Sequence, residues 1–171
     1  SGFVGFAQEM KAAYEHFDTS GVCSSECLQV FADAPWKCTF GEYRMPFLKT
    51  PYLMAASQFD GWQISNEVLG YNGIVADPTL DAGELAYVLE LGNETRAQVS
   101  LLPGEGGAKK SSVFSIACYS HHVSEKIKFS TEVSMNQVSQ SDALYWFLQD
   151  SIKTSLMYVD DCDGFNCGNC A

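Results

Sequence analysis

The sequence predicts an α/β fold in which a parallel sheet is flanked by helices and stapled by disulfides. An apolar run over residues 52–56 passes through a polar turn and reaches an acid, Asp60. A second apolar run, over residues 113–119, leads into His121. A helical pattern separates the two runs, and strand–helix–strand order implies a crossover between parallel strands. Seven cysteines supply the staples.

Periodicity and turn residues assign the other elements. Apolar side chains recur at three- and four-residue steps over residues 3–17, 82–102 and 142–155, which predicts three amphipathic helices. Gly92 interrupts the second of these, and Ser139 or Ser141 caps the third. Shorter expectations complete the chain: a helix over 61–69, a helical piece over 28–31, a packed loop over 36–41, loops over 70–80 and 103–110, and an exposed strand or extended arm over 126–133.

Charge and length exclude several classes of function. A chain of 171 residues suffices for one domain with a sizeable core. A net charge of −11 argues against nucleic acid or an anionic membrane as the partner. No apolar run reaches the length of a membrane span. The chain opens on Ser1 with no basic, apolar leader, so we expect that a leader has been removed or that the chain is a segment of something longer.

The cysteines predict an oxidising compartment. They stand at Cys23, Cys27, Cys38, Cys118, Cys162, Cys167 and Cys170, and the last three form a cysteine-rich tail. The odd number implies a free thiol or a partner outside this chain. A sequon at Asn93 agrees with secretion and glycosylation. Zinc is the competing interpretation, but no histidine stands at ligand spacing near the cysteine pairs, and we expect neither a metal nor a cofactor.

Asp60 and His121 are the candidate catalytic residues, because a sheet presents such groups where its parallel strands end. Acid before histidine is the order of α/β-hydrolases. Asp60 has a structural alternative: with Gln63 three residues on, it matches a helix N-cap. The two roles are compatible. His16, on an amphipathic helix, is assigned a packing or surface role.

The predicted sheet is too small to stand alone. Parallel sheets are normally buried on both faces and run through several strands, whereas this sequence supplies two or three. An open edge invites pairing with another chain. No G-x-S-x-G nucleophile motif occurs in the sequence, and no serine follows a strand-to-elbow pattern. We therefore expect this chain to pack against another polypeptide segment.

Several short motifs, in order and spacing, resemble one family. The chain is similar to the C-terminal half of the Notum and plant pectin acetylesterase family of secreted α/β-hydrolases, over nearly all of its length. The motifs are Trp36-Lys-Cys-Thr-Phe-Gly41, Asp60-Gly-Trp-Gln-Ile64, Leu91-Gly-x-Glu-x-Arg96, Cys118-Tyr-Ser-His121 and the terminal Cys162, Cys167 and Cys170.

The resemblance implies a Ser–Asp–His triad with Asp60 as the acid and His121 as the base, and His122 as a neighbour. It also implies two disulfides, Cys23 with Cys27 and Cys38 with Cys118, and a pair among the tail cysteines that leaves one over. The bridge to Cys118 is expected to hold the acid and the base in register.

Two functions compete. In the first, residues 1–171 are a single region, the C-terminal portion of a secreted carboxylic-ester hydrolase. A missing N-terminal segment or a second chain then supplies the nucleophile serine, and the substrate is an acyl ester of a polysaccharide or a lipidated protein. In the second, the chain is a catalytically inactive structural or glycan-binding subunit of an extracellular assembly. The nature of the sequence that precedes Ser1 discriminates between them, and we favour the first.

Overall fold

The computed structural model describes residues 6–102, 111–121, 124, 127–149 and 155–170. The chain divides into two compact units, one of residues 1–51 with 104–109 and one of residues 52–103 with 110–171. That both belong to one hydrolase domain stays a prediction. The predicted loop over residues 103–110 lies outside the described residues.

The first unit is helical. The predicted amphipathic helix is confirmed as α1, and the helical piece is longer than expected because Ser24 caps it by accepting a hydrogen bond from the Cys27 amide at 3.1 Å. The predicted packed loop is a 3-10 helix, and the Cys27–Cys38 disulfide joins it to α2. The elements of this unit are α1 (Phe6–Phe17), η1 (Thr19–Val22), α2 (Ser25–Val30), η2 (Pro35–Thr39), α3 (Gly41–Arg44) and η3 (Met45–Phe47).

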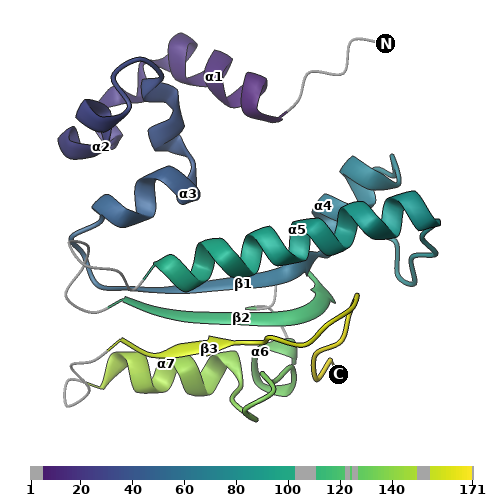
Figure 1. Ribbon diagram of the computed structural model, residues 1–171. Coiled ribbons are helices and arrows are strands. Elements are labelled where there is room, and N and C mark those ends of the chain that lie inside the picture. Colours follow the sequence, from purple (N-terminus) through teal and green to yellow (C-terminus); the bar gives the residue numbers. More distant parts are fainter. Residues whose placement is uncertain (1–5, 103–110, 122–123, 125–126, 150–154, 171) are drawn as a thin grey trace. The chain divides into compact units, whose positions relative to one another are not determined.

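The second unit contains the predicted parallel sheet. Its strands are β1 (Tyr52–Asp60), β2 (Ser111–Ser120) and β3 (Met157–Val159), in the order β1-β2-β3 with both pairings parallel (Figure 1). The polar turn predicted after residue 56 is wrong, because β1 continues to Asp60. Gln58 is fully buried in the strand, where its amide donates to the Asp160 carbonyl at 2.8 Å.

Helices cover both faces of this sheet, as the prediction requires. The elements are α4 (Gly61–Gln63), the π-helix η4 (Ile64–Val68), α5 (Ala82–Leu101), α6 (Lys128–Thr131) and α7 (Gln140–Leu148). Alternate side chains of β2 enter two separate cores. Phe114, Ile116 and Cys118 pack with Ala143 of α7, and Ala117 packs with Val88 of α5.

Gly92 does not interrupt α5, contrary to the prediction. The helix runs unbroken from Ala82 to Leu101 and starts at a capping box between Asp81 and Glu84. A Cβ atom at position 92 would lie 2.5 Å from the ring of Phe59. The glycine therefore allows α5 to approach β1 closely.

The expected strand or arm over residues 126–133 is wrong, because residues 128–131 form the short helix α6 and, among its described residues, only Val133 makes isolated antiparallel bridges, to Ser139 and Asn169. Lys128 and Glu132 form an ion pair of 2.8 Å across one helical turn, with the carboxylate almost fully buried. Ile127, one of the apolar residues in the alternation, is largely exposed. Ser139 caps α7 as predicted, but α7 ends at Leu148; residues 150–154 lie outside the described part of the chain.

Two of the disulfides that the resemblance implied are replaced by other pairings, whereas the pair expected within the tail is confirmed. Cys27 bonds to Cys38, Cys118 to Cys170 and Cys162 to Cys167, while Cys23 is a free thiol. The Cys23–Cys27 and Cys38–Cys118 pairings are therefore wrong. Helix α2 begins between the first two cysteines, and the buried Cys27 side chain bonds to η2. The Cys23 thiol instead contacts the Thr19 carbonyl at 3.7 Å.

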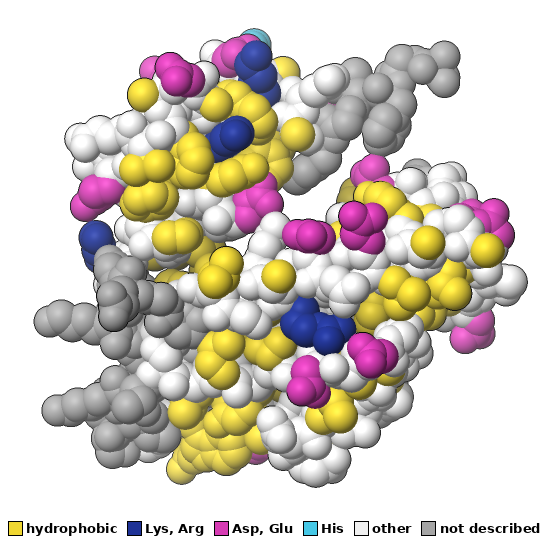
Figure 2. All heavy atoms as spheres, in the orientation of Figure 1, with side chains coloured by type: hydrophobic (Ala, Val, Ile, Leu, Met, Phe, Trp, Pro, Cys, Tyr) yellow, Lys and Arg dark blue, Asp and Glu magenta, His cyan; other side chains and the backbone are white. Residues whose placement is uncertain are grey.

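The surface agrees with the acidic composition. On the face drawn in Figure 2, acidic side chains are dispersed over both units, and the few basic ones lie among them. In the part of the chain that the structure describes, no helix combines the length and apolarity needed to cross a membrane.

Candidate active site

Asp60 stands where β1 ends and α4 begins, and its two carboxylate oxygens have different partners. Oδ1 accepts a hydrogen bond from the Gln63 amide at 2.8 Å, which caps α4. Oδ2 lies 2.7 Å from Nδ1 of His121. The capping alternative and the acid–histidine pair suggested by the sequence are thus both present in the geometry.

His121 reaches the acid because β1 and β2 are parallel and in register. Asp60 is paired with Ser120, the last residue of β2, so the next residue emerges beside the carboxylate. About 26% of the His121 side chain and 31% of the Asp60 side chain are exposed. An ionised Asp60 accepts the Nδ1–H of a neutral imidazole, which leaves the lone pair on Nε2. This is the tautomer that general-base chemistry needs.

A buried hydroxyl network holds the ends of the two strands together. The Ser65 hydroxyl, on the π-helix, donates to the Gly61 carbonyl at 2.7 Å and lies 2.8 Å from the Tyr119 hydroxyl. Both hydroxyls also bond the backbone of Val75. Gly61 follows the acid directly and Tyr119 precedes His121 by two positions. The network therefore fixes the separation that the predicted Cys38–Cys118 bridge was expected to fix.

Sequence reasoning missed this network. The signal available for it was weak, since a single serine in a helical pattern indicates nothing by itself. π-helical turns are rare and often occur at functional sites. The π-helical turn that carries Ser65 is evident only in the structure.

A cavity of about 410 Å³ opens beside the acid–histidine pair. It runs along β1 between Thr95 of α5 and Gln140 of α7, and most of its lining is small or polar. Gln140 is only 7% exposed, and its Oε1 has no hydrogen-bond partner in the described structure. The lining residues are Ala55, Ala56, Ser57, Asp60, Gln63, Thr95, Ser120, His121, Ser124 and Gln140.

The other predicted site residues are placed as follows. His122 lies outside the described residues, and Asn93 is exposed on α5, so its glycosylation stays a prediction. Six of the seven cysteines are in disulfides, which removes their thiolates as metal ligands. Among the residues that the structure describes, no group of three or more His, Cys, Asp or Glu side chains is placed to hold a metal ion.

The family model described as pectinacetylesterase matches residues 6–171. The chain belongs to the pectinacetylesterase family. No curated protein sequence matches it.

Solved structures of the Wnt deacylase Notum from Drosophila share the fold. One crystal form has a TM-score of 0.76 at 20% identity, and it covers 100% of this chain and 44% of the Notum chain. A second has a TM-score of 0.72 at 19% identity, with 100% and 45% covered. This pectinacetylesterase-family chain therefore forms part of an α/β-hydrolase fold and spans less than half the length of the Notum chains that it matches.

Proposed function

We propose that the chain supplies the acid and the base of a Ser–Asp–His carboxylesterase. The observation that carries the proposal is the 2.7 Å contact between Asp60 Oδ2 and His121 Nδ1 at the carboxyl edge of a parallel sheet. The pair borders a cavity and is partly open to solvent. Membership of the pectinacetylesterase family supports ester hydrolysis as the reaction.

In this reaction His121 moves protons and Asp60 orients it. Nε2 takes the proton of a serine hydroxyl as the serine oxygen attacks the ester carbonyl, and returns it to the alcohol that leaves. Water then attacks the acyl-serine with the same proton transfers, which releases the carboxylic acid. Asp60 holds the imidazole in the required tautomer and stabilises the imidazolium. The complete reaction consumes only an ester and one water molecule.

The serine comes from a segment outside residues 1–171. Within the described sheet β1 is an edge strand, and its free edge is the side on which a further strand would pair. The cavity is lined by Ala55, Ala56 and Ser57 of this strand and by the acid–histidine pair. An extended segment laid there in parallel would present its last residue to His121. The buried Oε1 of Gln140 has no donor among the described residues, and we propose that this segment supplies one.

The proposed substrate is an acetyl ester of a secreted or cell-wall polysaccharide. The pectinacetylesterase model matches this chain by sequence over residues 6–171, whereas the Wnt deacylase Notum matches it by fold at 20% identity. The description of the family model supports a polysaccharide ester as the first substrate to test, and the likeness to the Wnt deacylase Notum supports an acylated protein as the second. Three disulfides are typical of an extracellular protein, which favours secretion.

Active-site labelling of the complete protein with a fluorophosphonate tests the proposal. We expect the nucleophile to label, and His121→Ala to abolish labelling with little change in the unfolding temperature. His16→Ala, on the exposed side of α1, is the matched control and should label at the wild-type rate. If the protein is folded with its disulfides formed and does not label, the esterase proposal is refuted and the structural or glycan-binding subunit is favoured.

A further inference from the structure

Strand β2 carries a bulge at Ala117 and Cys118, a few residues before His121. Ser57 of β1 pairs with Ile116, but Phe59 pairs with Tyr119, so β2 has one more residue than β1 between the two pairs. A bulge leaves backbone groups outside the ladder and re-aims the strand that follows it. Unpaired backbone groups in a buried strand need other partners. The groups that bond the β2 backbone near the bulge therefore restrain the direction in which the strand continues to His121.

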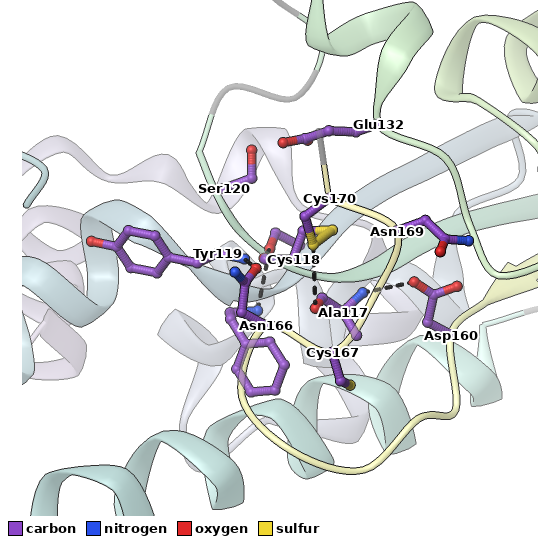
Figure 3. The surroundings of a disulfide bond; sticks show 12 residues. Ala117, Cys118, Tyr119, Ser120, Glu132, Asp160, Asn166, Cys167, Asn169 and Cys170 are labelled. Carbon is purple, nitrogen blue, oxygen red and sulfur yellow. Dashed lines mark hydrogen bonds between the residues drawn. A yellow bond between two sulfur atoms is a disulfide. The ribbon is translucent and has the colours of Figure 1, made fainter. Parts of the chain in front are cut away.

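One segment, residues 160–170, bonds the backbone of β2 at and after the bulge, and we call it the strap. The Asp160 carboxylate accepts from the Ala117 amide at 3.0 Å, and the Gly168 amide donates to the Ala117 carbonyl at 3.0 Å. The Asn166 side-chain oxygen accepts from the Tyr119 amide at 2.7 Å (Figure 3). These bonds continue, beyond the end of β3, the edge of β2 on which Val113 and Ser115 bond to the β3 segment, so the strap holds β2 through the bulge from the side opposite β1.

The strap is itself tied down at several points. One disulfide joins Cys170 to the bulge at Cys118, and another closes Cys162 to Cys167. Figure 3 shows the first disulfide beside the Asp160 and Asn166 contacts. From α5, the guanidinium of Arg96 donates to the Cys162 carbonyl at 3.2 Å. These bonds make the strap a fixed part of the sheet edge rather than a loose end.

Asp160 is the buried centre of this arrangement. Its side chain is almost completely buried, and its second oxygen accepts from the Met135 amide at 2.7 Å. The backbone of Gly168 passes so close that a Cβ there would lie 2.9 Å from the Asp160 carboxylate. A buried carboxylate needs such donors, since its desolvation is costly. One side chain thus joins β2, the strap and the segment before α7.

We propose that the strap is a positioning device for His121, with Asp160 and Asn166 as its positioning residues. The inference rests on the proposed function, because it concerns the imidazole of the acid–histidine pair. Asn166 holds the amide of Tyr119, two residues before the base, and Asp160 holds the amide of Ala117. Together they fix the direction in which β2 delivers Nδ1 to Asp60.

Asn166 offers the sharper test because it is exposed and its backbone is in the left-handed region, with φ of 54°. Asn166→Gly suits this backbone conformation and removes only the side-chain acceptor. Asn166→Asp keeps an acceptor oxygen at the same place and tolerates the same conformation. The pair of variants therefore separates the hydrogen bond to the Tyr119 amide from the shape of the strap.

In the complete protein we expect Asn166→Gly to slow fluorophosphonate labelling by about 10- to 100-fold, the loss typical of a displaced catalytic group. The unfolding temperature should change little. The Nδ1–H proton resonance of His121, followed by NMR in ¹⁵N-histidine-labelled protein, should shift or broaden. Asn166→Asp should restore both the labelling rate and the resonance.

Two results would overturn the inference: an Asn166→Gly protein with an unchanged His121 resonance, or an Asn166→Asp protein as impaired as the glycine variant. The NMR readout keeps the strap separate from the esterase. If the wild-type protein does not label, the proposed function fails, while the response of the His121 resonance to the two variants still decides whether the strap positions the ring.

Discussion

The two bonds of Asp60 can be separated by substitution. Asparagine caps helices as well as aspartate does, so Asp60→Asn should keep the 2.8 Å bond from the Gln63 amide. It removes the charge that faces His121 at 2.7 Å and presents an amide that favours the wrong imidazole tautomer. We expect the rate of ester cleavage to fall by about 10⁴-fold, as for other triad aspartates, with little loss of stability.

Asp60→Ala removes both bonds. The lost cap should lower the free energy of unfolding by about 1 kcal/mol. Because the complete protein is longer than this chain, that corresponds to a fall in unfolding temperature of at most about 2–4 °C. The rate of ester cleavage should fall at least as far as in Asp60→Asn. The two variants thus differ in stability and agree in reactivity.

The assay pairs the fluorophosphonate labelling rate of the complete protein with its thermal unfolding followed by circular dichroism. The reasoning is refuted if Asp60→Asn labels within about tenfold of the wild-type rate, far short of the loss expected for a triad acid. Asp60 would then be a helix cap only, and its contact with His121 would be incidental to any reaction.

Two further predictions concern packing. Gly92→Ala should lower the free energy of unfolding, because its Cβ would lie 2.5 Å from the Phe59 ring. Relieving that clash costs about 1–3 kcal/mol, which outweighs the gain of about 1 kcal/mol in helix propensity. Gly83→Ala, in the same helix, is the control and should not destabilise; equal thermal unfolding of the two would contradict the close approach. Ser65→Ala should cost about 1–3 kcal/mol in chemical denaturation, since it strands the Val75 amide that bonds its hydroxyl at 3.0 Å. An unchanged midpoint would show that water replaces the hydroxyl.

Elements with a strong local pattern were predictable from the sequence. The apolar runs that became β1 and β2 and the periodic stretch that became α5 gave the parallel crossover directly. The acid and the histidine followed, because each stands where its strand ends. Strand β3 has only three residues, and its pairing with β2 comes from the fold rather than from a local pattern. Residues 128–131 lie in a stretch that alternates like a strand, but they form a helix, in which Lys128 pairs with the buried Glu132 across one turn.

The disulfides were not predictable, for a different physical reason. Cys118 and Cys170 are 52 residues apart, and only the path of the strap brings their sulfur atoms together. The resemblance instead implied Cys23 as the partner of Cys27, although the helix cap at Ser24 turns the chain between them. Local spacing reports local geometry, and a bridge across a sheet depends on the tertiary fold.

The correction also changes how the acid and the base are held together. A bridge from Cys38 to Cys118 would have tied the base strand to the loop before the acid strand. The observed structure divides the task between Ser65 and Tyr119, which join the two strand ends by buried hydroxyls, and the strap, which holds the bulge in β2. Hydrogen bonds restrain direction as well as distance, whereas a disulfide at Cys118 alone would leave the three residues up to His121 free to twist. In the proposed reaction His121 keeps one nitrogen on Asp60 and turns the other toward a serine, and that task needs the directional restraint.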